Sequence, residues 1–180
     1  MMRTAIATTA MLMIAGVSVA APPTPLVCGG GKTTAKPTAI TAVDWCSATG
    51  VAMMGALVDG KSELHEYEEL GQPHDTILTR IASVDYADVD GDRRPEALVV
   101  IEQTAWFATR DEPSVSTDVA VYEWRRGAAV RMATLPAGSP VTALSVRRGV
   151  VTMTSGPDRA VTRHRWSSRK RAFAALPTAP

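Results

Sequence analysis

Short apolar runs separated by turn residues recur at roughly 8–12-residue intervals from Ile40 to the C-terminus, and this pattern constrains the fold most strongly. Each run has the length of a β-strand, and long stretches of helical periodicity are absent. We therefore expect an all-β fold, built as an antiparallel meander in a sandwich, a roll or a propeller-like sheet. One short helix is the alternative around Leu64, Tyr67 and Leu70, which recur at helical spacing.

The predicted strands begin with a hairpin whose arms are 51–58 and 61–70. Asp59-Gly60 joins the arms, because this dipeptide readily adopts the positive φ angles of a tight hairpin turn. An aspartate-rich segment, 88–96, then separates two apolar runs, and the second run is rich in Val and Ile, so we expect it to be a central strand. The remaining predicted strands are 77–86, 97–107, 119–124, 128–135, 141–146, 150–154, 161–166 and 171–176.

The chain begins with the pattern of a secretory signal peptide over residues 1–20. Arg3 precedes a charge-free apolar stretch that ends in Ser18-Val19-Ala20 and is followed by Pro22-Pro23. We expect cleavage after Ala20 or the next residue, no transmembrane anchor in the mature chain, and export to the periplasm or the extracellular space.

Residues 21–38 are rich in Pro, Gly, Thr and Ala, and this composition predicts a disordered linker. Residues 39–176 have the length of a single β-rich domain, and 177–180 should form a frayed tail. The two cysteines of the chain, Cys28 and Cys46, lie on either side of the boundary. An oxidising destination favours a disulfide between them, which would tie the linker to the start of the domain.

The acidic segment has the composition of a calcium loop. With Asp88 counted as the first position, carboxylates stand at the first, third, fifth and ninth positions, and Arg94 offers a backbone carbonyl at the seventh. Calcium takes about 6–8 oxygen ligands, so closely spaced carboxylates suit it. Gly91 lets the chain turn tightly around a centre. An EF-hand is excluded, because Arg93 stands where that motif requires glycine.

The sequence DVDGDRRPEALVV, residues 88–100, resembles the calcium loop of FG-GAP and VCBS-type repeats, D-x-[DN]-G-D-G-x-x-[DE], which an apolar strand follows. The order of strands around it is similar to that of small secreted bacterial proteins of unclear role. The resemblance implies one Ca²⁺ ion, with side-chain ligands Asp88, Asp90, Asp92 and Glu96 and a backbone ligand from Arg94. Arg93 replaces the second glycine of the motif; if this position has a positive φ, the side chain costs on the order of 1 kcal/mol.

An ordinary turn is the alternative interpretation, since aspartate and glycine are common in turns and Arg93 and Arg94 can act as counter-ions. The loop, however, places its four carboxylates within nine residues. These charges repel one another unless a cation joins them, so we favour calcium in a mainly structural role.

Charge is divided unevenly along the chain. Residues 21–118 contain 7 basic and 16 acidic residues, whereas residues 119–180 contain 11 basic and 2 acidic residues. The simpler interpretation is that the two halves attract each other within one β-structure, and an anion-binding face is the alternative. Tryptophan lies beside arginine in 124–126 and 163–166; because side chains alternate along a strand, we expect the aromatic rings inward and the arginines outward.

The sequence contains no motif typical of catalysis. Its three histidines form no zinc-binding pattern, and G-x-S-x-G is absent. We therefore expect a non-enzymatic, exported calcium-binding β-module that binds a protein or glycan of the envelope or extracellular space. The alternative is a protein whose basic C-terminal strands bind an anionic polymer such as an acidic glycan; a secreted hydrolase is less favoured, and no nucleic-acid partner is expected.

Overall fold

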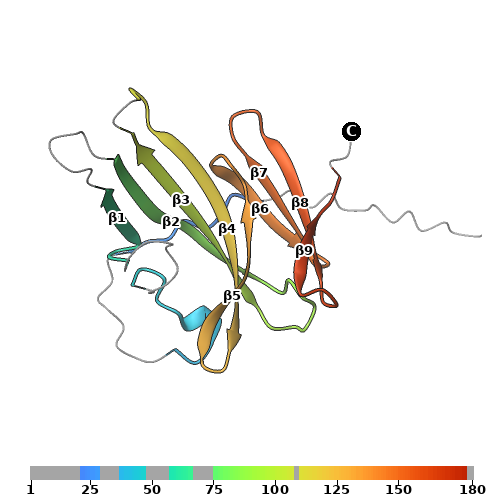
Figure 1. Ribbon diagram of the computed structural model, residues 1–180. Coiled ribbons are helices and arrows are strands. Elements are labelled where there is room, and N and C mark those ends of the chain that lie inside the picture. Colours follow the sequence, from blue (N-terminus) through green and yellow to red (C-terminus); the bar gives the residue numbers. More distant parts are fainter. Residues whose placement is uncertain (1–20, 29–36, 48–56, 67–74, 108–109, 178–180) are drawn as a thin grey trace, which may run out of the picture.

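The computed structural model describes residues 21–28, 37–47, 57–66, 75–107 and 110–177, and they form two antiparallel sheets (Figure 1). The strand orders are β1-β2-β3-β4-β5 in one sheet and β6-β7-β8-β9 in the other. The strands are β1 (Lys61–Glu66), β2 (Asp75–Ala87), β3 (Glu96–Trp106), β4 (Ser114–Arg125), β5 (Ala128–Pro136), β6 (Val141–Arg147), β7 (Val150–Ser155), β8 (Ala160–Ser167) and β9 (Ala172–Ala175). The predicted all-β meander is confirmed, and β3 is the central strand of the larger sheet as expected.

Strand boundaries differ from the prediction mainly at β4, which begins at Ser114 inside a stretch expected to be loop. Its polar first residues pair with the end of β3, where Ser116 lies opposite Gln103. The hydrogen-bond ladder therefore continues past the end of the apolar pattern. The part of the chain that the structure describes also contains one 3-10 turn, η1 (Ile40–Ala42).

The predicted first hairpin is described only in part. Asp59 and Gly60 have φ angles of 50° and 73°, so the expected turn is confirmed, and Val58 forms an isolated bridge with Lys61. The helical alternative does not hold for β1, which pairs with β2 along its whole length. Residues 51–56 and 67–70 lie outside the described residues, as do the predicted signal peptide and residues 178–180.

Strand β3 is buried on both of its faces. Ala97, Val99 and Ile101 belong to an outer cluster, whereas Leu98 and Val100 belong to an inner cluster. Other members of the outer cluster are Ile40, Trp45, Leu57, Ile81, Val84, Ala120 and Tyr122. The inner cluster further contains Val89, Val119, Val121, Leu135, Leu144, Val151 and Met153. The continuous apolar run of β3 thus reflects two different layers of packing.

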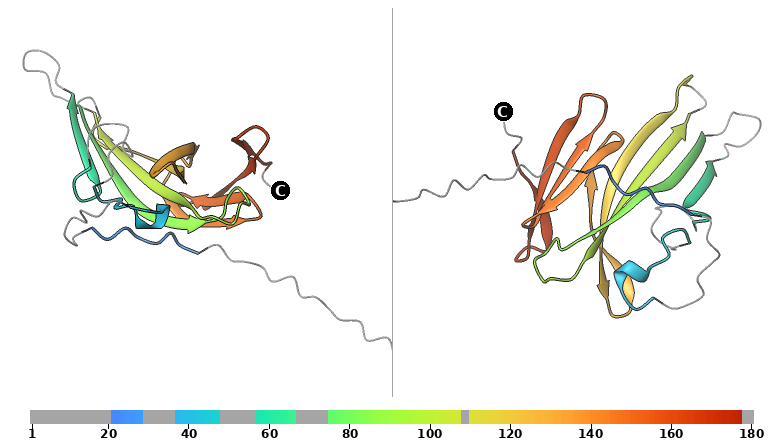
Figure 2. Two further views of the ribbon diagram at one scale, coloured as in Figure 1. Left: turned by 90° about the horizontal axis from the view of Figure 1, so that it is seen from below. Right: turned by 180° about the vertical axis from the view of Figure 1, so that it is seen from behind.

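The inner cluster joins the two sheets. Leu144, Val151 and Met153 come from the four-stranded sheet and meet residues of β3 and β4. Seen from below, the sheets form one curved layer (Figure 2, left), and β5 contacts β9. The fold is therefore a strongly curved pair of sheets around one shared core.

Residues 21–28, which composition assigns to a linker, run behind the larger sheet and reach β6 of the smaller sheet (Figure 2, right). The carbonyl of Ala21 accepts a hydrogen bond from the Leu144 N–H at 3.0 Å, and the N–H of Leu26 donates to the Ala82 carbonyl at 3.0 Å. Pairing of β1 with β2 ends at Arg80, so the edge of β2 beyond it is free to bind this segment. We call residues 21–28 the N-terminal strap.

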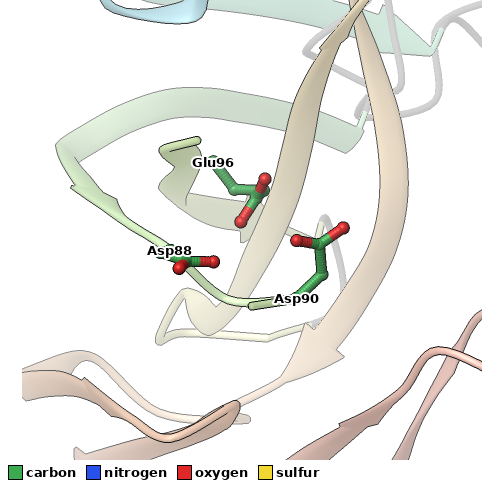
Figure 3. Close-up of side chains that lie close together, drawn as sticks. All are labelled: Asp88, Asp90 and Glu96. Carbon is green, nitrogen blue, oxygen red and sulfur yellow. The ribbon is translucent and has the colours of Figure 1, made fainter. Parts of the chain in front are cut away.

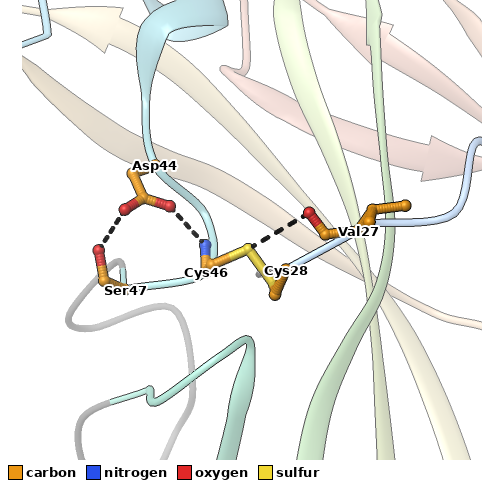
Figure 4. Close-up of a disulfide and its surroundings, with 5 residues drawn as sticks. All are labelled: Val27, Cys28, Asp44, Cys46 and Ser47. Carbon is orange, nitrogen blue, oxygen red and sulfur yellow. Dashed lines mark hydrogen bonds between the residues drawn. A yellow bond between two sulfur atoms is a disulfide. The ribbon is translucent and has the colours of Figure 1, made fainter. Parts of the chain in front are cut away.

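The N-terminal strap ends in a disulfide between Cys28 and Cys46, which confirms the predicted pairing (Figure 4). The turn around Cys46 is fixed by Asp44, whose carboxylate accepts hydrogen bonds from the Cys46 N–H at 3.1 Å and the Ser47 hydroxyl at 2.6 Å. The preceding Trp45 is buried in the outer cluster. The crosslink therefore holds a segment that covers the back of the larger sheet.

The loop between β2 and β3 carries the acidic residues, three of which are enlarged in Figure 3. No helix within the described residues has the length and apolar character needed to cross a membrane.

Reduction of the disulfide should lower the free energy of unfolding by about 3 kcal/mol, because the crosslink spans a sequence separation of 18 and restricts the unfolded chain. For a domain of this size the melting temperature should fall by roughly 6–12 °C. Thermal unfolding with and without a phosphine reductant measures the effect. The Cys28→Ser/Cys46→Ser variant is the control and should melt like the reduced protein in both conditions. Equal melting temperatures for oxidised and reduced wild type would contradict the prediction.

Candidate metal centre

The acidic loop spans residues 88–95 and connects two paired strands. Ala87 at the end of β2 lies opposite Glu96 at the start of β3, so the ends of the loop are held together by the sheet. Val89 points into the inner cluster and is completely buried, although both of its neighbours are aspartates. The loop is thus anchored at its ends by hydrogen bonds and at its second residue by hydrophobic burial.

Backbone N–H groups inside the loop orient its aspartates. Carboxylate oxygens accept these N–H groups at 2.7–3.1 Å, with Asp88 bound by Gly91 and Arg93, Asp90 by Asp92, and Asp92 by Arg94. Each carboxylate oxygen has two lone pairs, so an oxygen that accepts one N–H keeps a lone pair for a cation. The local turn chemistry of aspartate therefore arranges the side chains without exhausting them as ligands.

Three carboxylates from this region converge (Figure 3). Asp88, Asp90 and Glu96 each offer an oxygen, and these oxygens lie within 4.8 Å of one another. Calcium binds oxygen at about 2.3–2.6 Å, so two ligands on opposite sides of one ion are about 5 Å apart. The separation and the all-oxygen chemistry of the three groups fit a calcium ion.

The other two predicted ligands lie differently. Asp92 is exposed and is absent from the converging group; its carboxylate accepts the Arg94 N–H at 2.7 Å and so closes the last turn of the loop. Arg94 is also exposed. The structure therefore brings together the carboxylates of three of the five predicted residues.

Glu96 is the most unusual member of the group because only 3% of its surface is exposed. Its Oε2 accepts a hydrogen bond from the Val89 N–H at 2.7 Å. The pKa of Glu96 is raised from 4.5 to about 7, mainly by burial and also by the charges of Asp90 and Asp92, while hydrogen bonds from the backbone of Val89 and Asp90 oppose the shift. Near neutral pH, the ionised form of this carboxylate is strongly favoured only when a positively charged group lies beside it.

Arg93 adopts the conformation that the motif reserves for glycine. Its φ is 70°, and that of Gly91 is 87°, so the loop uses two left-handed residues. A non-glycine residue in this region is disfavoured by contact between its Cβ and the backbone. The strain anticipated at this position is therefore present.

No protein-family model matches the chain, and neither does any curated protein. The resemblance to the FG-GAP and VCBS loop is thus a likeness of one short motif. Sequence reasoning missed Val89, which both anchors the loop and orients Glu96 through its N–H. The signal that could have revealed it is a lone apolar residue between two ligand-type aspartates.

The buried carboxyl of Glu96 predicts a pH dependence of the metal-free protein. Its pKa is higher in the folded chain than in the unfolded chain, so its proton favours the folded state. This contribution is complete below about pH 4.5 and is lost as the pH rises to about 7, so the free energy of unfolding should fall over that interval. Glu96→Gln keeps an oxygen acceptor for Val89 but removes the charge, so this variant should lack that part of the slope.

Urea unfolding in the presence of a chelator, from about pH 5 to about pH 8, measures the difference between wild type and Glu96→Gln. The variant should be the more stable protein at the upper end of the range. Asp158→Asn, which neutralises an exposed acid on another turn, should follow the wild-type profile. Parallel profiles for wild type and Glu96→Gln would show that burial of this carboxyl has no thermodynamic effect.

The positive φ of Arg93 predicts that Arg93→Gly stabilises the protein by about 1 kcal/mol, since glycine relieves the strain and loses part of this gain through its greater freedom in the unfolded chain. Arg94→Gly is a matched control, because it removes the same charge from the next residue, whose φ is not positive. Urea unfolding of both variants in chelator should show stabilisation for Arg93→Gly alone. An equal effect of the two substitutions would assign it to charge rather than to backbone conformation.

Proposed function

We propose that this protein is an exported calcium-binding β-module in which calcium is mainly structural and the folded module binds a protein or glycan of the envelope or extracellular space. The observation that carries the proposal is the convergence of Asp88 and Asp90 with the buried Glu96. Three carboxylates at this separation repel one another, and a divalent cation turns that repulsion into attraction.

Burial of the Glu96 carboxylate distinguishes this loop from an ordinary acidic turn. A turn needs no carboxylate inside the protein, whereas Glu96 is buried at the first position of the central strand. Backbone hydrogen bonds from Val89 and Asp90 only partly offset the loss of water, as the raised pKa of Glu96 indicates. Calcium would supply the missing charge and would hold the β2–β3 connection closed through Asp88 and Asp90.

The surroundings of the loop suggest how a structural ion could serve binding. A cavity of about 380 Å³ lies beside it and is lined by Asp92, Arg94, Glu123 and Trp124 among other residues. Because one wall of the cavity is the loop itself, an ion that fixes the loop also fixes that wall. The Cys28–Cys46 disulfide supports an oxidising location outside the cytoplasm.

Calcium should stabilise the fold through mass action. If the dissociation constant is on the order of 0.2 mM, as for other extracellular modules, about 2 mM calcium adds roughly 1.4 kcal/mol to the free energy of unfolding. The melting temperature should then rise by about 3–6 °C. Asp90→Ala should abolish most of this increment while the metal-free variant stays folded. Magnesium should substitute poorly, because it requires a smaller and nearly octahedral shell.

Thermal melts of wild type and variants in chelator, calcium and magnesium test the proposal. Asp158→Ala removes one negative charge from the turn between β7 and β8 and should keep the full response to calcium. A wild-type protein that melts at the same temperature in chelator and in several millimolar calcium has only an acidic turn, and the proposed function is then wrong.

A further inference from the structure

The four-stranded sheet and its turns are almost uniformly basic. Residues 141–175, all of them described, contain eight basic residues: Arg147, Arg148, Arg159, Arg163, Arg165, Arg169, Lys170 and Arg171. Their one acidic residue is Asp158, in the turn between β7 and β8. Antiparallel order places that turn at the opposite end of the sheet from the β6–β7 and β8–β9 turns. The single acid is therefore remote from most of the basic residues.

Strand register gathers several arginines on the outer face of this sheet. Arg147 on β6 lies opposite Val150 on β7, and Val150 lies opposite Arg165 on β8, so these side chains share one face. Adjacent strands are about 4.8 Å apart, so the two arginines start roughly 10 Å from each other. Arg163 is two residues along β8 on the same face, about 7 Å from Arg165. All three arginines are exposed.

The opposite face of β8 points into the protein. Trp166 packs against Phe173 with ring centroids 5.1 Å apart, and both contact the inner cluster. His164 is half-buried, and burial lowers its pKa. The alternation expected for residues 163–166 is confirmed: the arginines face outward, and the tryptophan faces inward.

The turns at one end of the sheet extend the basic face. Arg148 belongs to the β6–β7 turn, and Arg169, Lys170 and Arg171 belong to the β8–β9 turn. Arg148 and Arg171 both have a φ of 49°, a conformation that asparagine or glycine adopts at lower cost. Both turns therefore place an arginine in a conformation that local backbone preference disfavours.

Intramolecular ion pairing leaves this surface largely unneutralised. Among the described residues, Arg171 is the only member of the eight with an ion-pair partner, Glu123 at 3.5 Å. No ion pair in the described part of the chain joins an acid from 21–118 to a base from 119–180. Within the described residues, the acidic side chains of 21–118 therefore do not neutralise the basic side chains of 119–180 through ion pairs.

We propose that the outer face of the four-stranded sheet, with its β6–β7 and β8–β9 turns, binds a linear acidic polysaccharide. Guanidinium groups bind carboxylate and sulfate groups through paired hydrogen bonds, and the arginine spacing of about 7–10 Å spans neighbouring charged sugars. Val150, which lies directly between Arg147 and Arg165, is buried. The next row along the sheet places the small, half-buried hydroxyl side chains of Ser145 and Thr152 beside Arg163.

Other polyanions fit this face less well. Single-stranded nucleic acid is held by stacking of bases on aromatic rings, but the aromatic side chains of this sheet, Trp166 and Phe173, pack inward. An anionic bilayer is bound more strongly when apolar side chains insert, and within residues 141–177 the exposed large apolar side chain is Val161 alone. A flexible acidic glycan needs neither feature.

The β6–β7 turn lies against the acidic loop, since a Cβ on Gly149 would be 3.3 Å from the Val89 carbonyl oxygen. The arginines proposed here are not ligands of the ion, however, so each proposal can fail without the other. The probe is dextran sulfate, with neutral dextran as its uncharged counterpart, and binding is measured by titration calorimetry of the oxidised protein. If about four sulfates are engaged, raising NaCl from about 50 to about 200 mM should weaken binding roughly 100-fold. Arg163→Gln/Arg165→Gln should reduce the slope of log affinity against log salt by about two.

The matched control is Arg126→Gln/Arg131→Gln, which removes the same charge from exposed positions outside the four-stranded sheet that, among the described residues, form no ion pair. The control should keep the wild-type slope of log affinity against log salt. Both double variants should have the melting temperature of the wild type, because their changed side chains are exposed. Equal losses in the two double variants, or no binding of dextran sulfate, would overturn the proposal. Binding to phosphatidylglycerol vesicles without binding to dextran sulfate would overturn it in favour of a lipid surface.

Asp90→Ala should bind dextran sulfate like the wild type below its melting temperature, so a failed calcium response leaves this test intact.

Discussion

Strand β3 can bury its side chains only if two separate layers reach it. On one side the layer is the curved pair of sheets around the inner cluster, and on the other it is Ile40, Trp45 and their neighbours. Loss of either layer would expose alternate residues of the most apolar strand in the fold. The disulfide and the N-terminal strap matter for the same reason, because they hold the second layer on a sheet whose curvature turns its back toward solvent.

The candidate metal centre depends on this strand as well. Glu96 is the first residue of β3, so the strand that fills both cores also carries the buried carboxylate into the acidic loop. Val89 then joins the loop to the inner cluster and donates its N–H to Glu96. Packing and ligand geometry are therefore coupled through two residues, and a change in the core at Val89 would alter the position of the carboxylate.

The strands could be predicted because their sequence signals are local, and the disulfide could be predicted because it has one possible pairing. Turn residues such as Asp59-Gly60 delimit the strands, and a chain with two cysteines permits one intramolecular pairing. The route of the N-terminal strap could not be predicted, since its backbone hydrogen bonds depend on where β1 stops pairing with β2. Likewise, spacing identified five candidate ligands, but the burial of Glu96 and the outward turn of Asp92 are set by tertiary packing.

The N-terminal strap also imposes an order on assembly. Its first described residue, Ala21, bonds to Leu144, whereas Leu26 bonds to Ala82, so the earliest part of the chain is bound by segments that are synthesised much later. Contacts between residues this far apart in sequence form slowly, because a long loop must close before they stabilise anything. Along the chain the two sheets are connected by the short segment between β5 and β6, and in space they are packed together by the inner cluster. The strap is therefore expected to bind late, because its hydrogen-bond partners on β2 and β6 must both be in place before it can bridge the two sheets.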